Sequence, residues 1–226
     1  MAPPGVGGAV RLEIQWLDRF VGAVFAEGDH VARIVERPGP RDRSTLVSAG
    51  VFIFPPEIFE TTRDLPPAPS GEHELTGGIQ GLIDRGIEVK ALPISGYWAN
   101  LTDPDALIWT NQRVQGEMLE SGNGGQLVDS TARVSPEARV SPLAAIADYA
   151  QVDARAELAD NVSVGSQCVI GPDCRLQSCI LLEKVTVGAG ATIENAVVDA
   201  GATIPPGAVI RSPVGRAAIV WKSMYA

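Results

Sequence analysis

The 226-residue sequence is poor in the features that mark secreted, membrane-spanning or nucleic-acid-binding proteins. Its three cysteines are an odd number without framework spacing, which argues against a disulfide scaffold and favours a reducing cytoplasm. No apolar run approaches the roughly 18 residues of a membrane span, and the opening MAPPGVGGAV lacks the basic residues of a signal peptide. A net charge of −9 disfavours a nucleic-acid surface. We therefore expect a cytoplasmic protein that binds neither membranes nor nucleic acid.

The acidic charge does not exclude a phosphate substrate, because phosphate binding needs only a local cluster of donors. Arg37, Arg41 and Arg43 could form such a cluster. The composition, with 45% hydrophobic and 20% charged residues, is that of an ordinary soluble globular protein.

An aliphatic residue recurs every six positions in the second half of the sequence, and the register skips one residue twice. The repeated positions are Val128, Val134, Val140, Ile146, Val152, Leu158, Val164, Ile170 and Leu176, then Leu181, Val187 and Ile193, and finally Val198, Ile204 and Ile210. A small residue follows most of them four positions later, and Gly165, Gly171 and Gly188 follow directly. This spacing is too sparse for a helix stripe and too regular for loops. It predicts short strands joined by tight turns, three to a coil, in about five coils.

The repeat resembles the left-handed parallel β-helix of hexapeptide-repeat proteins, whose handedness is an exception to the usual right-handed crossover. Each aliphatic side chain would stack on its counterpart one coil along, and the open final coil would need a cap. Trp221 and Tyr225 are candidates for that cap or for a partner site. Cys168 and Cys174 occupy small inward positions and fit no zinc spacing, so we interpret them as core residues.

The first half alternates strand-like and helix-like segments, which predicts an α/β sheet. The strand-like segments are VGAVF, VARIVE, the continuous apolar run LVSAGVFIF, which reads as a buried strand, and IEVKALPI. The helix-like segments are PPEIFETT, ELTGGIQGLIDR, which ends at the C-cap candidate Gly86, and DALIWTNQRVQGEMLES. Asp103 and Pro104 stand at the N-cap and first position of the last helix.

The domain boundaries follow from these patterns. The opening GVGGAV follows no strand and is not a dinucleotide-binding fingerprint, so residues 1–9 are expected to be a disordered terminus. Residues 10–120 would form the sheet-and-helix domain, SGNGGQ at 121–126 the linker, and 127–226 the β-helix with its C-terminal cap.

Four segments in this order, followed by a hexapeptide prism, resemble the later part of a sugar-1-phosphate nucleotidyltransferase, also called an NDP-sugar pyrophosphorylase. The segments are VARIVERP, LVSAGVFIFPPEIFE, GEHELTGGIQGLIDRGIEVKALPISGYW and ANLTDPDALIWTN. The resemblance implies a partial, Rossmann-like nucleotidyltransferase domain. It also implies a reaction in which a sugar 1-phosphate attacks a nucleoside triphosphate and pyrophosphate leaves with the help of Mg²⁺.

The resemblance also assigns substrate-binding residues. The family's Glu-Lys-Pro motif falls on Glu36 and Arg37, where the glutamate would bond sugar hydroxyls and the guanidinium would hold the sugar phosphate by two bonds. The family's Asn-Ala-Gly motif begins at Ser48 and ends at Gly50, which would let the backbone approach the sugar. Trp98 opens the family's Trp-x-Asp motif. In the alternative interpretation, Glu36 and Arg37 are a solvated strand end and Gly50 is a packing glycine.

Two departures from the family pattern bear on activity. Nothing in the sequence matches the glycine-rich loop, with its Arg and Lys, that cradles the triphosphate, so the domain is expected to be truncated and to lack pyrophosphorylase activity. The family's second metal-binding aspartate is Asn100 here, and a neutral amide supplies no countercharge to a hard cation. Asp103 is expected to serve as the N-cap rather than as a metal ligand. We therefore assign no catalytic residue and no metal ligand, although the family implies Mg²⁺.

Two hypotheses of different class remain open. In the first, a longer form of the protein carries the missing half, binds a nucleoside triphosphate and makes a nucleotide sugar. In the second, the chain is a catalytically silent regulatory subunit or sugar-phosphate sensor that associates with an active relative. Histidine-dependent acyl transfer, known from other hexapeptide proteins, is not expected because His30 and His73 lie outside the repeat. In either case we expect an oligomer formed through the prism.

The charge of residue 100 gives a test of the resemblance. If Asn100 lies near a bound sugar phosphate, no carboxylate repels the anion when metal is absent. At ~4 Å and an effective dielectric near 20, one such charge is worth about 4 kcal/mol before screening. Calorimetry should therefore show weak sugar-1-phosphate binding in the presence of a chelator, and weaker binding by Asn100→Asp. Tighter binding by Asn100→Asp without metal would refute this placement.

Overall fold

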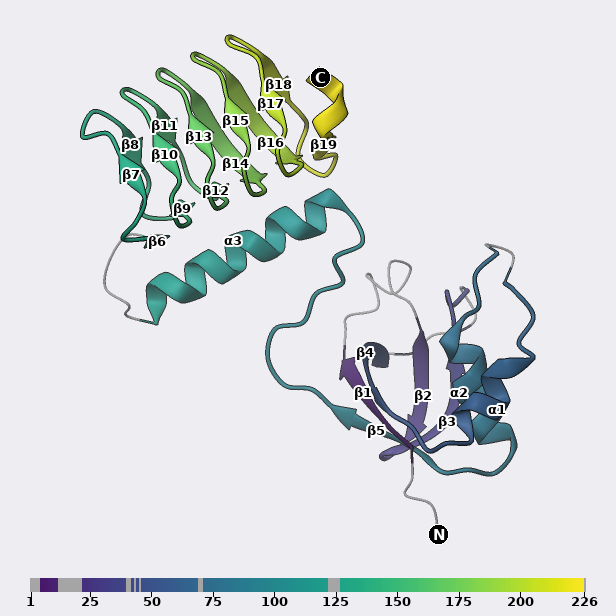
Figure 1. Ribbon diagram of the computed structural model, residues 1–226. Helices are drawn as coiled ribbons and strands as arrows, with labels where there is room; N and C mark the ends of the chain where they lie inside the picture. The colour runs from purple at the N-terminus through teal and green to yellow at the C-terminus, as the bar shows by residue number, and fades with distance from the viewer. Residues whose placement is uncertain are drawn as a thin grey trace. The chain divides into compact units, whose positions relative to one another are not determined.

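The computed structural model describes residues 5–11, 22–39, 42, 44, 46–68, 71–121 and 127–225, with the backbone alone described for 5–11 and 225. The chain divides into two compact units, one ending at Trp98 and the other beginning at Ala99 (Figure 1). No helix in these ranges combines the length and apolar content needed to cross a lipid bilayer.

The first unit is a five-stranded sheet with two helices, which confirms the mixed α/β expectation. Its strands are β1 (Gly5–Arg11), β2 (Ala23–Glu27), β3 (His30–Val35), β4 (Leu46–Ile53) and β5 (Val89–Pro93). They lie in the order β1-β4-β2-β3-β5, and β5 pairs back with β1 to close the sheet. The pairings are antiparallel except that of β1 with β5.

Two helices complete the first unit. Helix α1 (Ile58–Arg63) lies against α2 (Leu75–Asp84), and α2 ends just before Gly86, whose φ of +75° is the left-handed conformation typical of a helix end. Ile79 and Leu82 of α2 are buried with apolar residues of the strands. The burial of one face of α2 attaches the helix pair to the sheet.

Two expectations about the first unit were wrong. Residues from Gly5 onward form β1 instead of belonging to a disordered terminus, because strand pairing uses backbone groups and β1 has a partner strand on each side. The apolar run of β4 is not a buried strand. Val47 is fully buried, but Val51 and Ile53 are 62% and 69% exposed, since no described residue covers their face of the sheet.

The second unit is a parallel β-solenoid of about five coils, as the repeat predicted. One stack of strands contains β6 (Leu127–Val128), β9 (Ala145–Ile146), β12 (Ser163–Val164), the second parts of β14 (Arg175–Leu181) and β16 (Thr192–Val198), and β19 (Ala218–Val220). The next contains β7 (Arg133–Val134), β10 (Gln151–Val152), β13 (Val169–Ile170), β15 (Thr186–Val187) and β17 (Thr203–Ile204). The third contains β8 (Arg139–Val140), β11 (Glu157–Leu158), the first parts of β14 and β16, and β18 (Val209–Arg211).

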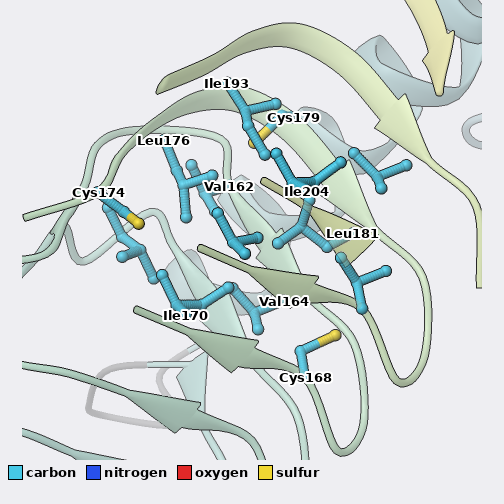
Figure 2. Packing of buried hydrophobic residues seen from close by; sticks show 14 of the residues in the cluster. Val162, Val164, Cys168, Ile170, Cys174, Leu176, Cys179, Leu181, Ile193 and Ile204 are labelled. Carbon is cyan, nitrogen blue, oxygen red and sulfur yellow. The ribbon is translucent and has the colours of Figure 1, made fainter. Parts of the chain in front are cut away.

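The repeated aliphatic residues fill the interior of the coils, as expected. Ile170, Leu176 and Ile193 are buried in one continuous core, and Figure 2 shows Cys168 and Cys174 among them. The cysteines are core residues, as interpreted from the sequence. Burial raises the pKa of the third thiol, that of Cys179, to about 12, which keeps it protonated and unreactive.

The two register skips have a structural explanation. Early coils advance eighteen residues, as from Val128 to Ile146, and later coils advance seventeen, as from Leu181 to Val198. At the skipped corners β14 and β16 continue through the bend, where Ser178 and Asn195 take φ values of 45° and 52°. Other corners also contain a left-handed residue, such as Arg155 and Asn161, so the skipped corners differ in that the strand continues through them.

Helix α3 (Pro104–Glu120) belongs to the solenoid unit and runs along the stacked coils (Figure 1). Asp103 caps it as predicted, since its Oδ1 accepts a hydrogen bond from Ala106 N at 2.8 Å. Ile108 is buried against Ile180 and Val197 of the solenoid. The compact units therefore divide at Trp98 and Ala99, and not at the expected linker, because this apolar contact joins α3 to the coils.

The glycines that follow the aliphatic positions have a packing role. A Cβ added to Gly165 would lie 2.7 Å from the Leu182 carbonyl carbon of the next coil, and one added to Gly188 would lie 2.5 Å from Pro206 N. These contacts are with backbone atoms, which cannot rotate away. Glycine is therefore required where adjacent coils approach most closely.

We predict that Gly165→Ala lowers the free energy of unfolding by about 1–3 kcal/mol, the usual effect of overpacking. The matched control is Gly116→Ala on α3, where an added Cβ meets no atom within 4 Å. That change should raise stability by about 0.5–1 kcal/mol, because alanine is favoured over glycine in a helix. Chemical denaturation of both variants measures the difference, and equal effects would refute the packing role.

Candidate functional site

Glu36 lies just beyond β3 and is held in place by a threonine of α2. Thr76 donates a hydrogen bond from Oγ1 to Glu36 Oε2 at 2.9 Å, and its side chain is buried. The glutamate is half-buried. It is therefore an oriented acceptor and not a freely solvated strand end, which favours the binding interpretation over its alternative.

The environment of Glu36 changes its acidity. Burial raises the pKa of the carboxyl above its ordinary value, and the hydrogen bond from Thr76 opposes that rise. Nearby Glu74 raises the pKa further, whereas Arg37 lowers it. The carboxylate is thus partly desolvated but retains a donor, the condition in which a bound hydroxyl group would form a strong additional hydrogen bond.

Ser48 and Gly50 lie at a bulge in β4. The register between β1 and β4 shifts between the pairs Gly7–Phe52 and Ala9–Ser48, so more residues of β4 than of β1 span this stretch. Gly50 has a φ of +77°, and an added Cβ would meet no atom within 4 Å. Glycine is needed there for its backbone conformation and not for packing. The space on the side-chain side of Gly50 is therefore open, although its own N–H donates a hydrogen bond to Ser48 Oγ at 3.2 Å.

Trp98 is bonded to this bulge, and Gly22 links the bulge to Thr76, the partner of Glu36. Trp98 donates from Nε1 to the Ala49 carbonyl at 3.2 Å, which ties the indole to the bulge. Ser48 N donates to the Gly22 carbonyl at 2.9 Å. A Cβ on Gly22 would lie 3.3 Å from both Ser48 Cβ and Thr76 Cγ2. The first unit thus brings Glu36, Ser48, Gly50 and Trp98 into one connected region.

Arg37 is less firmly placed than these residues. Its Nη2 lies 3.2 Å from Glu72 Oε2, in an ion pair whose side chains are both well exposed. Such surface pairs contribute little, so an anion can displace the glutamate. Arg37 also has a φ of 45°, unusual for a residue other than glycine, and such backbone outliers often occur at functional sites. Arg41 and Arg43, the other members of the expected phosphate cluster, lie outside the described residues.

Sequence reasoning missed Thr76 and Gly22. Thr76 stands in the first turn of α2, where the sequence marks only a helix start. Gly22 has a φ of +81° directly before β2, but a lone glycine there carries no signal of what approaches it. Thr76 and Gly22 both contact residues that are distant in the sequence, and no local sequence pattern predicts such contacts.

Two family models match adjacent parts of the chain. A nucleotidyl transferase model matches residues 18–117. A model of the GMPPB C-terminal domain matches residues 123–222, which contain the solenoid.

The curated relatives agree with these matches. A glucose-1-phosphate thymidylyltransferase of Streptomyces antibioticus is 32% identical over 47% of this chain and 30% of its own length. The chain belongs to the sugar-1-phosphate nucleotidyltransferase family. In Haloferax volcanii, the low-salt glycan biosynthesis nucleotidyltransferase Agl11 is 27% identical over 49% of this chain and 30% of its own length. A UTP–glucose-1-phosphate uridylyltransferase of that organism, AglF, is 27% identical over 48% of this chain and 45% of its own length. The matches of this nucleotidyltransferase-family chain thus span less than half the length of these relatives.

Nucleotidyltransferases of this family typically use Mg²⁺, but the described residues do not fit a magnesium site. Asn100 is neutral, and a hard cation prefers carboxylate ligands. The neighbouring carboxylate of Asp103 is occupied as the cap of α3. Among the described residues, no group of three or more His, Cys, Asp or Glu side chains could hold a metal ion. The role of Asn100 stays a prediction.

The hydrogen bond between Thr76 and Glu36 can be tested by titration. Because the bond stabilises the ionised carboxylate, Thr76→Val should raise the pKa of Glu36. Thr76→Ser keeps the hydroxyl group and is the matched control, with a pKa near that of the unmodified chain. Carbon-detected NMR of the side-chain carboxyl measures both values. An unchanged or lower pKa in Thr76→Val would show that the hydroxyl does not support the carboxylate.

Proposed function

We propose that the first unit binds a sugar 1-phosphate as the sugar-phosphate half of a nucleotidyltransferase. In the full reaction, a nucleoside triphosphate and a sugar 1-phosphate give a nucleotide sugar and pyrophosphate. The observation that carries the proposal is the oriented Glu36 carboxylate, held by Thr76 beside the open bulge at Gly50. An acceptor next to accessible backbone is the arrangement that a polyhydroxylated ligand requires.

Each residue has a distinct task in this proposal. Glu36 accepts hydrogen bonds from sugar hydroxyls through the carboxylate oxygen that Thr76 leaves open. Backbone groups near Gly50 meet the ring edge, since no Cβ stands in the way. Trp98 keeps the bulge in shape through its bond to Ala49. Arg37 exchanges Glu72 for the phosphate, which it can hold by two parallel bonds.

Nucleotidyl transfer itself needs a site for the triphosphate. The relatives are longer than the segments they share with this chain, and we assign the triphosphate site to nucleotidyltransferase sequence beyond that shared part. It can be supplied by the same polypeptide or by a second one. The attacking atom would be a phosphate oxygen of the sugar 1-phosphate, and the leaving group pyrophosphate.

A second candidate function is a catalytically silent regulatory subunit that senses sugar phosphate or associates with an active relative. Asn100 favours it, because an amide replaces a carboxylate at the position the family uses for metal binding. A pyrophosphate-release assay with sugar phosphates, triphosphates and Mg²⁺ separates the two. Turnover in the ordinary range of ~1–10³ per second would exclude the silent form.

We predict that the 226-residue chain binds glucose 1-phosphate in calorimetry and that Glu36→Gln weakens binding about ten-fold or more. The reason is that a hydrogen bond to a charged acceptor is worth about 1.5–3 kcal/mol. Glu60→Gln is the matched control, since Glu60 is exposed on α1 and its carboxylate pairs with Arg85. Calorimetry with other hexose 1-phosphates measures which sugar is preferred. The proposal fails if no hexose 1-phosphate binds, or if both variants lose affinity equally.

A further inference from the structure

A groove lies between the start of α3 and the later coils of the solenoid, within the second unit. Its volume is about 290 Å³, and its walls include Leu107 of α3, Leu182 and Val197 of the coils, and Trp221, which precedes the short 3₁₀ helix Lys222–Tyr225. A cavity of about 150 Å³ is enough to hold a benzene ring. The groove therefore has room for a small molecule with one ring and a short side chain.

Two carboxylates share the groove with these apolar side chains. Asp103 and Asp199 both line it, and neither forms an ion pair within the described ranges. Lys222 lies close to Gly201 but does not belong to the groove lining. The acidic charge inside the groove is thus not neutralised by a basic side chain that lines it.

The two carboxylates are not equivalent. Asp103 is the cap of α3, and the positive end of the helix dipole already offsets its charge. Asp199 is half-buried, and its Oδ1 accepts a hydrogen bond from Ala200 N at 2.8 Å. No donor to its Oδ2 lies among the residues that the structure describes. Asp199 is therefore the stronger attractor for a positively charged ligand.

Trp221 adds a second group that attracts cations. It is 54% exposed although it lines the groove, so a ligand can reach the indole. The face of an indole ring binds ammonium groups more strongly than that of any other aromatic side chain. An apolar wall, an indole and a carboxylate with a free oxygen are together the groups that recognise an organic ammonium ion.

Other classes of ligand fit this groove less well. Its described lining contains no Lys, Arg or His, and the two carboxylates would repel a phosphate or carboxylate group. A neutral apolar molecule would cover the walls but leave Asp199 desolvated without a partner, which costs free energy. Charge complementarity therefore selects a cation with an apolar body.

We infer that this groove binds a small organic cation, an apolar ring that carries an ammonium group. The ammonium group donates to Asp199 Oδ2, and the ring packs against Leu107 and Trp221. The ligand is a free small molecule and not a protein segment, because the groove fits one substituted ring, whereas a stable protein partner covers a far larger surface. This inference is independent of sugar-phosphate binding in the first unit.

The test uses the whole chain and three ligands of similar shape. Phenethylamine is the cationic probe, and phenethyl alcohol and phenylpropionate are its neutral and anionic counterparts. Calorimetry should show millimolar binding of the amine, about ten-fold tighter than that of the alcohol, and no binding of the anion. In proton–nitrogen NMR spectra, the amine should shift the indole N–H signal of Trp221, which is identified as the signal lost in Trp221→Phe.

The decisive variant is Asp199→Asn, whose side-chain oxygen can still accept from Ala200 N but carries no charge. It should weaken binding of the amine roughly ten-fold and remove the preference for the amine over the alcohol. Asp129→Asn is the matched control. Asp129 likewise accepts a backbone hydrogen bond, from Thr131 N at 2.8 Å, and it does not line the groove.

A second pair of variants repeats the test should Asp199→Asn fail to fold, as judged by circular dichroism. Trp221→Leu should weaken binding of the amine, whereas Trp109→Leu should not, because Trp109 is 41% exposed on α3 and does not line the groove.

Three results would overturn the inference. Absence of binding by both phenethylamine and benzyltrimethylammonium would show that the groove takes no organic cation. Equal affinities for the amine and the alcohol, or equal weakening by Asp199→Asn and Asp129→Asn, would show that Asp199 does not recognise the charge. Binding that leaves the Trp221 signal unchanged would place the ligand elsewhere.

Discussion

The solenoid depends on the stacking of one aliphatic side chain on its counterpart in the next coil. Most of its strands are two residues long and have no stability of their own, so each exists only because a neighbouring coil pairs with it and covers it. The stacking of Ile170 with Val187 and of Leu176 with Ile193 brings the coils close together. That spacing requires Gly165 and Gly188 at the nearest backbone approaches. Ile180 and Val197 of the aligned coils then form the apolar surface against which Ile108 of α3 packs.

The solenoid could be predicted from the sequence because its constraint is local and repeated. Each coil has the same spacing of aliphatic residues, so the repeat is visible in the sequence. Even the two register skips are visible, since the corners at Ser178 and Asn195 omit one residue while the aliphatic side chains still point into the core. The docking of α3 could not be predicted. It rests on contacts such as that of Gln115 Nε2 with the Val162 carbonyl at 2.9 Å, between residues far apart in the sequence.

The strands of the first unit were harder to predict from the sequence, because pairing with neighbouring strands, and not local composition, determines which segments are strands. The glycine-rich β1 has little strand propensity, yet it pairs on both sides through its backbone. The apolar composition of β4 indicates burial, but Val51 and Ile53 show that apolar residues do not by themselves create a covering layer. The candidate site likewise depends on contacts between residues that are distant in the sequence. Glu36 was assigned from a family resemblance, whereas its partner Thr76 became visible only when the fold brought them together.

The family's Trp-x-Asp motif is divided between the two compact units. Trp98 is tied to the first unit by its hydrogen bond to Ala49. Asn100 lies in the second unit, three residues before Asp103, whose capping bond starts α3. Since α3 is buried against the solenoid at Ile108, the chain after the tryptophan is anchored to the coils. The position that the family gives to a metal ligand thus belongs to the solenoid unit, whereas the proposed sugar-binding residues belong to the first unit.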